Sequence, residues 1–273
     1  MTSVKIGFIG LGLIGGSIAK TIRRYYPDYE LLAFDKNRET LALAVQEGTI
    51  HTSCSSIDDN FKGCTYIFLC APVAYNTAYL PQLKDLMDSG CILTDVGSVK
   101  TSIHKEVISL GMEESFIGGH PMAGSEKSGF SSSKAHLIEN AYYILTPSAK
   151  VPEEKVTAFR DFISSLKAIP VILDYKKHDY ITGTISHLPH IIASTLVNFV
   201  RDTDSEDELM KALAAGGFKD ITRIASSSPV MWQQICLKNG ENISHILGNY
   251  IDTLSRAKEL VDSGDDEALY TMF

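Results

Sequence analysis

The sequence predicts an α/β Rossmann-type N-terminal domain with a mostly parallel sheet, followed by an all-α C-terminal domain. Apolar runs suited to β-strands alternate with helical patterns as far as Asp174. A glycine-rich turn joins the first of these runs to the first helical pattern. Beyond Asp174 no β-rich run follows, and helical spacing dominates through Leu269. We therefore place the two domains at residues 1–174 and 175–273.

Composition limits the classes of function. The chain has 273 residues, 44% hydrophobic and 21% charged, as is typical of a soluble globular protein with about two domains. Its net charge of −8 argues against binding to nucleic acid or to an anionic membrane surface. No apolar run reaches the roughly 18 residues of a membrane span. We expect neither a nucleic-acid partner nor a membrane.

The cysteines and the N-terminus indicate a cytoplasmic protein. The five cysteines are odd in number and contain no C-x-x-C pair, so we interpret them as reduced thiols and not as a disulfide framework or a zinc site. The apolar N-terminal run has no basic region beyond Lys5 and is rich in glycine, so it is interpreted as the start of the fold and not as a signal peptide.

The glycine-rich turn is the main motif of the chain. The apolar run from Val4 to Ile9 breaks at Gly10, and a helix-compatible segment begins at Leu13. Gly10, Gly12 and Gly15 stand in G-x-G-x-x-G register. In this motif the first glycine allows a tight turn, the second lets the backbone approach a pyrophosphate, and the third lets the helix pack closely on the strand. The pyrophosphate then meets the helix N-terminus and its partial positive charge.

Asp35 indicates which cofactor the glycine-rich turn binds. It ends the second apolar run and lies 20 residues after Gly15, the place where a carboxylate binds the adenosine ribose. The alternative is an ordinary βαβ turn with a solvated Asp. A carboxylate here should repel a 2′-phosphate, so we predict NAD as the cofactor, although Lys36 and Arg38 could tolerate that phosphate. The predicted cofactor-binding residues are Gly10, Gly12, Leu13, Ile14, Gly15, Asp35, Ala71 and Pro72.

The rest of the first domain continues the alternation. Pro72 ends a strand whose end should face the cofactor. The last strand is expected to close the sheet. Strands are predicted at 66–70, 91–96, 115–119, 141–145 and 169–173, and helices at 38–48, 74–89 and 152–166. In the second domain a helix is predicted from about Lys177 to Phe199, with a kink near Ile185 caused by Pro189.

Two polar loops follow predicted strands of the first domain. His120 is enclosed by Gly119 and Pro121 at a strand end, which favours a functional over a structural histidine. Ser98 could cap the helix that starts near Thr101, orient the imidazole of His120, or do both. Glu126 is interpreted as a charge at the rim of the site or as a latch to a base elsewhere.

The helical domain offers a second group of polar candidates. Ser186 and His190 are four residues apart and share a helix face. His187 and His190 could form a paired-histidine metal site, but no H-E-x-x-H motif and no third ligand accompanies them, so no metal is predicted. Lys219 and Arg223 are also four apart and could bind a carboxylate or form a solvated helix face. Trp232 is interpreted as a packing residue, with a place in the wall of the site as the alternative.

These motifs together resemble the prephenate dehydrogenase family, which includes arogenate dehydrogenases. The resemblance covers nearly the whole chain and is specific, since other Rossmann dehydrogenases lack its three middle motifs. Its motifs are Gly-Leu-Ile-Gly-Gly-Ser at 12–17, Asp-Val-Gly-Ser-Val-Lys at 95–100, Gly-His-Pro-Met-Ala-Gly-Ser-Glu-Lys-Ser-Gly at 119–129, Ser-His-Leu-Pro-His at 186–190 and Gly-Gly-Phe-Lys-Asp-Ile-Thr-Arg at 216–223.

The resemblance implies a reaction and roles for residues. The reaction is NAD-dependent oxidative decarboxylation of prephenate to 4-hydroxyphenylpyruvate in tyrosine biosynthesis. His120 would be the catalytic base and Ser98 its hydrogen-bond partner, while Arg223 would bind the ring carboxylate. A homodimer through the helical domain is also implied. Further residues that would line or gate the substrate pocket are Ser125, Glu126, Ser186, His190 and Lys219.

Three other functions stay open from the sequence. Arogenate differs from prephenate only at its side chain, and no single residue decides between them. A β-hydroxyacid dehydrogenase would need a Lys base on the first long helix of the second domain, where this chain offers only Lys176 and Lys177 near the start. A non-catalytic NAD-binding sensor would lack the pairing of His120 with Ser98.

Overall fold

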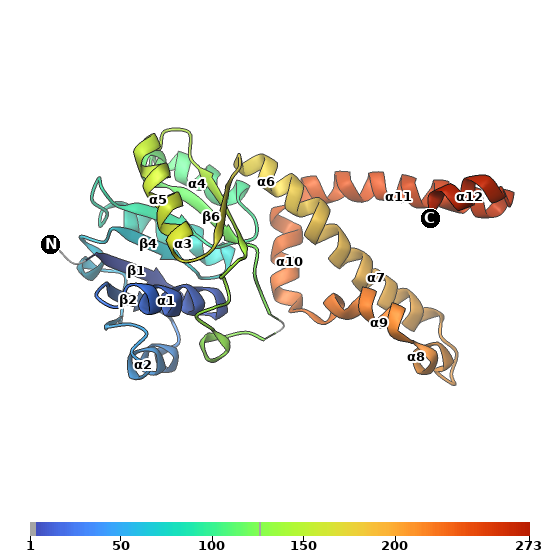
Figure 1. The fold of residues 1–273 in the computed structure, drawn as a ribbon, viewed down its shortest axis with the longest axis horizontal. Coiled ribbons are helices and arrows are strands. Elements are labelled where there is room, and N and C mark those ends of the chain that lie inside the picture. The colour runs from blue at the N-terminus through green and yellow to red at the C-terminus, as the bar shows by residue number, and fades with distance from the viewer. Residues whose placement is uncertain (1–3, 126) are drawn as a thin grey trace. The chain divides into compact units, whose positions relative to one another are not determined.

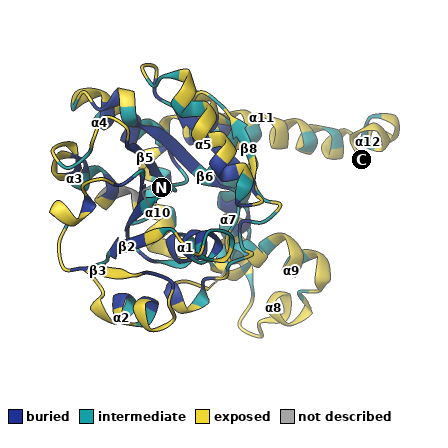
Figure 2. Ribbon diagram, turned by 60° about the vertical axis from the view of Figure 1, so that its left-hand side comes forward, coloured by how far each residue is buried: buried dark blue, intermediate teal, exposed yellow. Residues whose placement is uncertain are grey.

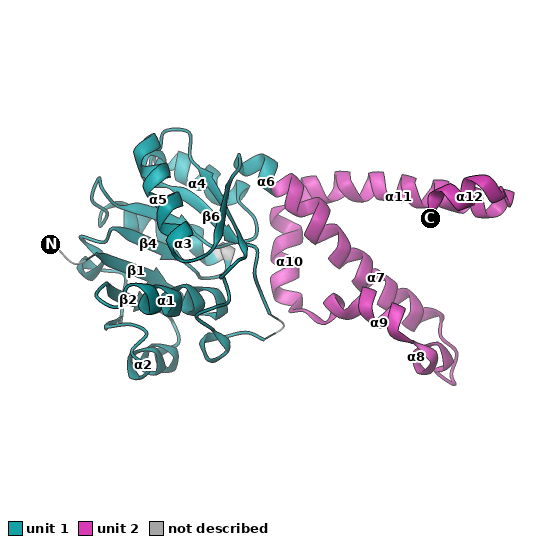
Figure 3. Cartoon of the chain, viewed as in Figure 1, with its two compact units in different colours: residues 1–178 teal, residues 179–273 magenta. Residues whose placement is uncertain are grey.

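The computed structural model describes residues 4–125 and 127–273 of the chain (Figure 1). It divides into two compact units, residues 1–178 and 179–273 (Figure 3). The domain boundary predicted at Asp174 stays a prediction. Among the described residues, no helix is long and apolar enough to cross a membrane.

Unit 1 is built on a parallel five-stranded sheet with the strand order β3-β2-β1-β4-β5. The crossover from one side of β1 to the other creates the point where ligands bind in α/β sheets of this kind. The mostly parallel Rossmann-type fold predicted for this region is confirmed. The strands are β1 (Lys5–Ile9), β2 (Glu30–Phe34), β3 (Thr52–Cys54), β4 (Tyr66–Leu69) and β5 (Ile92–Asp95).

Alternate side chains of the strands fill two separate cores. Ile6 and Phe8 of β1 belong to one cluster with buried residues of helices α1 (Leu13–Tyr25) and α5 (Glu153–Ser165). Ile9 belongs to the other, with residues of α3 (Val73–Lys84) and α4 (Thr101–Ser109). Both faces of the sheet are therefore covered by helices, and in Figure 2 its strands are mostly buried except for the edge strand β3. This burial explains why the strands are continuous apolar runs.

One expectation about the sheet is wrong, and one strand was not predicted. The last three strands do not close the main sheet but form a second sheet, β6 (Ile117–Pro121), β7 (Tyr142–Pro147) and β8 (Ile169–Ile172), in which β6 and β7 are antiparallel. A single parallel bridge between Leu93 and Phe116 joins the region before β6 to β5. The edge strand β3 was missed because it has only three residues, two of them exposed.

The expected helices are present with small shifts of their ends. Asn37 caps helix α2 (Arg38–Gln46) by accepting hydrogen bonds from the Glu39 and Thr40 amides. The helix that begins near Thr101 has Lys100 at its N-cap and no side-chain cap, so the capping role considered for Ser98 is wrong.

The helical second unit contains the segment where a kink was predicted. Helix α6 (Tyr175–Thr182) passes into a π-helical turn (Gly183–His187), and α7 (Leu188–Thr203) follows with Pro189 in its first turn. The turn contains Ile185, so the irregularity lies where Pro189 removes a backbone donor. The remaining helices are α8 (Leu209–Leu213), α9 (Gly216–Thr222), α10 (Pro229–Lys238), α11 (Gly240–Ser263) and α12 (Asp266–Met272).

Candidate active site

The glycine-rich turn between β1 and α1 has the backbone that the motif requires. Gly10 has a φ of +94°, and its amide donates to the carbonyl of Phe34 over 2.8 Å. A Cβ at Gly10 would lie 2.7 Å from the amide nitrogen of Ala71, at the end of the neighbouring β4. Glycine is therefore needed here both for the left-handed conformation and for the close approach of the two strand ends.

The other two glycines of the motif shape the start of α1. A Cβ at Gly15 would meet the Gly10 carbonyl oxygen at 2.6 Å and Cys70 Cβ at 2.8 Å, so this glycine lets the helix lie close on the strands. A Cβ at Gly12, the N-cap, would meet nothing within 4 Å. The backbone of Gly12 is therefore open to a ligand, and Leu13 and Ile14 form the first turn behind it.

Asp35 is held beside this turn by backbone amides. Its Oδ2 accepts a hydrogen bond of 2.7 Å from the Leu11 amide, and its Oδ1 accepts one of 2.8 Å from the Asn37 amide. Because Leu11 lies between Gly10 and Gly12, the carboxylate links the end of β2 to the glycine-rich turn. The Asp35 side chain is consequently fixed where the motif places the ribose.

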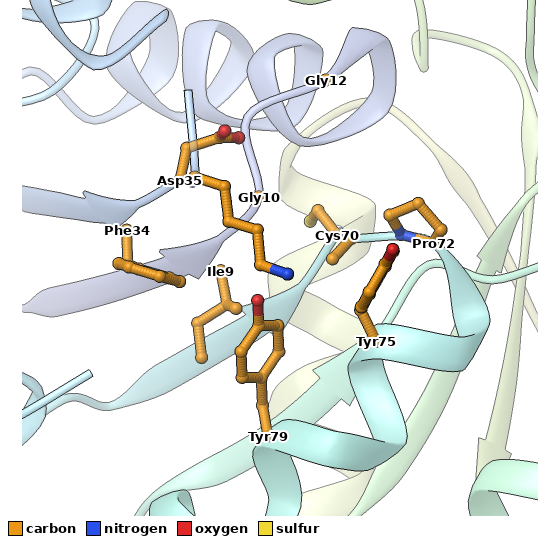
Figure 4. Close-up of a pocket in the computed structure, with 11 residues that line it drawn as sticks. Ile9, Gly10, Gly12, Phe34, Asp35, Cys70, Pro72, Tyr75 and Tyr79 are labelled. Atoms are coloured by element: carbon orange, nitrogen blue, oxygen red, sulfur yellow. The ribbon is translucent and has the colours of Figure 1, made fainter. Parts of the chain in front are cut away.

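A pocket of about 230 Å³ lies at the ends of β1, β2 and β4 (Figure 4). Five of the predicted cofactor-binding residues line it, namely Gly10, Gly12, Asp35, Ala71 and Pro72. Leu13, Ile14 and Gly15 are not part of this lining and lie in α1. The open backbone, the helix N-terminus and the fixed carboxylate are the features that a dinucleotide needs, so the pocket fits NAD.

The sequence reading missed the aromatic wall of this pocket. Tyr75 and Tyr79 line it from α3, together with Phe34 from β2 (Figure 4). The two tyrosines are four residues apart directly after a strand end, and this spacing could have indicated a shared helix face. Lys36 also lines the pocket, and its Nζ lies 4.3 Å from the centroid of the Tyr75 ring.

His120 lies near the carboxyl end of β6 and is half-buried. Its Nδ1 is 2.8 Å from Nε2 of His178, a hydrogen bond between two imidazoles. His178 lies in α6, is fully buried, and is fixed by the hydrogen bond from its amide to the Asp174 carbonyl. The sequence reading missed His178, because its 58-residue separation from His120 gives no local signal.

A buried ion pair holds the strand that carries His120. Lys100 Nζ contacts Asp95 Oδ2, and the side chains of both residues are at most 1% exposed. Lys100 Nζ also donates to the Gly119 carbonyl over 2.7 Å, and the Gly119 amide donates to Asp95 Oδ1 over 3.2 Å. Both polar groups of Gly119, the residue before His120, are thus tied to the end of β5. Neither Asp95 nor Lys100 was assigned this role from the sequence.

The other predicted residues of unit 1 are placed as follows. Ser98 is half-buried in the loop between β5 and α4, and its orienting role toward His120 stays a prediction. Ser125 is exposed, and its Oγ accepts a hydrogen bond of 3.2 Å from the Lys127 amide. Glu126 lies outside the described residues.

In unit 2 the structure stacks His190 on Trp232, with ring centroids 3.5 Å apart. His190 is 7% exposed, and burial lowers its pKa below the usual value, which favours the neutral imidazole. Its Nε2 and the Trp232 Nε1 are buried, and neither makes a hydrogen bond with the described part of the chain. Each of the two stacked rings therefore carries a buried polar atom without a hydrogen bond to the described residues. Ser186 lies half-buried in the π-helical turn.

Lys219 and Arg223 are both exposed in unit 2. Lys219 lies in α9, and Arg223 begins the 3₁₀ turn that directly follows this helix. Their positive charges are presented by adjoining elements, where they could bind an anion.

The strand order, the glycine-rich turn and the pocket define a Rossmann-type, NAD-binding oxidoreductase. Two family models then match the chain, the prephenate dehydrogenase nucleotide-binding domain at residues 18–172 and the prephenate dehydrogenase dimerization domain at residues 174–273. The chain therefore belongs to the prephenate dehydrogenase family, and the resemblance found in the sequence is confirmed.

Individual relatives agree with this assignment. Prephenate dehydrogenase of Bacillus subtilis is 37% identical over 97% of this chain and 72% of its own length. That of Lactococcus lactis is 39% identical over 98% of this chain and 74% of its own. The crystal structure of A. aeolicus prephenate dehydrogenase with hydroxyphenyl propionate and NAD⁺ superposes with a TM-score of 0.93 at 31% identity, covering 100% of this chain and 95% of that one.

Proposed function

We propose that the chain catalyses NAD-dependent oxidative decarboxylation of prephenate to 4-hydroxyphenylpyruvate in tyrosine biosynthesis, with His120 as the base. The observation that carries this proposal is the placement of His120. It lies at a strand end, fixed by His178 and by the anchored Gly119, in the unit that holds the dinucleotide pocket. Membership of the family supplies the substrate, and relatives named prephenate dehydrogenase favour it over arogenate.

In this reaction the protein's own side chains have to transfer one proton. Bound at the glycine-rich turn and Asp35, NAD⁺ would supply the acceptor for the hydride that leaves the ring carbon bearing the hydroxyl group. His120 takes the proton of that hydroxyl, so that a carbonyl can form as the carbon–hydrogen bond breaks. Carbon dioxide then leaves from the quaternary ring carbon, its bonding electrons make the ring aromatic, and the resulting phenolate oxygen takes back the proton that His120 accepted. The residues around His120 serve to orient its imidazole toward the hydroxyl.

Different parts of unit 1 would hold the cofactor. The Gly12 backbone and the first turn of α1, Leu13 to Gly15, would receive the pyrophosphate. Asp35 would accept hydrogen bonds from the ribose, since its oxygens are already held beside the turn. Ala71 and Pro72 would border the cofactor at the end of β4.

The substrate carries two carboxylates, which call for cationic and hydrogen-bonding groups. We propose that Arg223 binds the ring carboxylate, because its planar guanidinium suits two parallel hydrogen bonds. The buried Nε2 of His190 and Nε1 of Trp232, which make no hydrogen bond with the described residues, are further candidates for contacting the substrate. The complete proposed set is Ser98, His120, Ser125, Glu126, Ser186, His190, Lys219 and Arg223.

We also propose that the enzyme is a cytoplasmic homodimer assembled through unit 2. Most of the large hydrophobic side chains that the structure leaves exposed belong to this unit, and they need cover. The matching model describes a dimerization domain. The cytoplasmic location is supported by five cysteines that are all free thiols.

The activity is tested by incubating the purified protein with NAD⁺ and following NADH absorbance. Prephenate should give NADH and 4-hydroxyphenylpyruvate. Faster turnover with arogenate than with prephenate would identify the enzyme as an arogenate dehydrogenase. Turnover of a β-hydroxyacid but not of prephenate would contradict the proposal, and so would NAD⁺ binding without turnover of any of the three substrates.

A further inference from the structure

The contact between His120 and His178 restricts where protons can lie. Two doubly protonated imidazoles would direct N–H groups at each other, which does not agree with a hydrogen bond of 2.8 Å. One of the two facing nitrogens must therefore be a donor and the other an acceptor. If His178 donates, Nδ1 of neutral His120 is the acceptor and the ring proton of His120 lies on Nε2. If His120 donates, its Nε2 carries the lone pair.

Only the second arrangement lets His120 take a proton at Nε2. We infer that His178 is a positioning residue, whose Nε2 accepts a hydrogen bond from His120 Nδ1–H and thereby keeps Nε2 of His120 as the basic nitrogen. The hydrogen bond made by one ring nitrogen sets the protonation of the other. This inference rests on the proposed role of His120 as the base.

The surroundings of His178 suit a fixed acceptor. The residue is 0% exposed, and its imidazole meets that of His120 at an interplanar angle of 63°. The Asp174 side chain accepts hydrogen bonds from the Lys176 and Lys177 amides, and the His178 amide bonds to the Asp174 carbonyl. The start of α6 is thus fixed by hydrogen bonds, and rotation of the His120 ring would break its contact with a side chain that has little freedom.

A neutral imidazole differs from a carboxylate as the partner of a base. It orients the ring and selects its tautomer without placing a negative charge beside the imidazolium that forms. Removing His178 should therefore affect the fraction of His120 in the active tautomer and orientation, with little effect on the binding of the substrate or of NAD⁺. The expected loss is about 10- to 100-fold in kcat, by analogy with the range for removing the partner that orients a metal-binding imidazole.

The test compares His178→Leu with His178→Gln in the full-length protein. The Gln side-chain amide reaches about as far as Nε2 of histidine, and its oxygen can accept from Nδ1–H. His178→Leu should lower kcat about 10- to 100-fold with KM for prephenate and Kd for NAD⁺ within about twofold, and His178→Gln should recover most of kcat. His104→Leu is the control, because it removes a fully buried imidazole of unit 1 that is bonded to Thr146 instead. It should lower Tm with little change in kcat.

A second measurement covers the case in which His178→Leu does not fold. Nitrogen-15 spectra of the wild-type protein at alkaline pH distinguish Nδ1–H from Nε2–H in neutral His120. We expect Nδ1–H in the wild type and in His178→Gln. Nε2–H in the wild type, an unchanged kcat in His178→Leu, a loss seen only in KM, or a Gln variant as impaired as the Leu variant would each overturn the inference.

The assay also separates this inference from the proposed function. If His120→Asn loses kcat but His178→Leu does not, His120 is the base and only the positioning role fails. If His120→Asn keeps its kcat, the assignment of the base fails, and the role of His178 fails with it.

Discussion

Asp35 shows how a single side chain can set cofactor choice. Both of its oxygens accept hydrogen bonds from backbone amides, so the carboxylate cannot turn away from the ribose site without losing these bonds. A 2′-phosphate would meet this negative charge at close range. Lys36 does not offset it fully, because the structure places its Nζ over the Tyr75 ring.

We therefore predict that NAD⁺ is used at least about tenfold more efficiently than NADP⁺, which corresponds to about 1.4 kcal/mol. Asp35→Asn keeps an oxygen that can accept from the Leu11 amide but removes the negative charge. It should therefore reduce the ratio of efficiency with NAD⁺ to efficiency with NADP⁺. Asp59→Asn, at an exposed carboxylate elsewhere in unit 1, should leave it unchanged. The measurement is kcat/KM for each cofactor at saturating prephenate. Equal efficiency of the wild type with both cofactors would refute the role of Asp35.

Arg223 gives the second prediction at this scale. If Arg223 binds the ring carboxylate, Arg223→Ala should raise KM for prephenate. The reason is that the substitution removes a charge-assisted contact that contributes roughly 2–3 kcal/mol to binding. Kd for NAD⁺ should barely change, because the dinucleotide pocket belongs to unit 1. Arg160→Ala, at a surface arginine paired with Asp161, is the matched control. An unchanged KM in Arg223→Ala would show that Arg223 is only a surface charge.

Among the helices and strands, features set by neighbouring residues were predicted from the sequence, whereas contacts between segments far apart in the chain were not. The glycines, Asp35, Pro72 and most strands follow from short patterns, because turn geometry and burial act within a few residues. The second sheet and the contact of His120 with His178 depend on how remote segments pair. The short strand β3 is set by its neighbour β2 and carries almost no pattern of its own.

The approach of β6 to β5 provides a test of how His120 is positioned. A Cβ at Gly119 would lie 2.5 Å from the Asp95 carbonyl oxygen, a backbone atom that cannot easily move. Gly119→Ala should therefore destabilise the protein by roughly 1–3 kcal/mol and lower kcat, because β6 must shift with His120 on it. Gly90→Ala, where a Cβ meets nothing within 4 Å, is the control. Denaturant unfolding and kcat check both effects, and wild-type values in Gly119→Ala would contradict this account of the strand contact.

For the whole molecule, the exposed apolar surface of α11 predicts assembly. Ile251, Leu254 and Val261 are 53%, 51% and 64% exposed, and Leu254 and Val261 are seven residues apart on one side of the helix. Light scattering at micromolar concentration should give twice the chain mass of 29.9 kDa.

Substitution on this helix tests where the dimer forms. Ile251→Glu should shift the protein toward the monomer, because a charge would be buried in the interface. Ile108→Glu, an equally drastic change at an exposed position of α4 in unit 1, should leave the mass unchanged. A monomeric wild-type protein would rule out the dimer, and a dimeric Ile251→Glu variant would place the interface elsewhere.

The most direct test of the central claim is kcat of His120→Asn with NAD⁺ and prephenate. Asn is polar and similar in reach but cannot take the hydroxyl proton. We predict a loss of roughly 10²–10⁴ in kcat, the usual share of general base catalysis, with a much smaller change in KM. The wild-type kcat/KM should fall at acid pH, because only the neutral imidazole of His120 can act as the base. A near-normal kcat in His120→Asn, with the acid limb of the pH profile unmoved, would contradict the account.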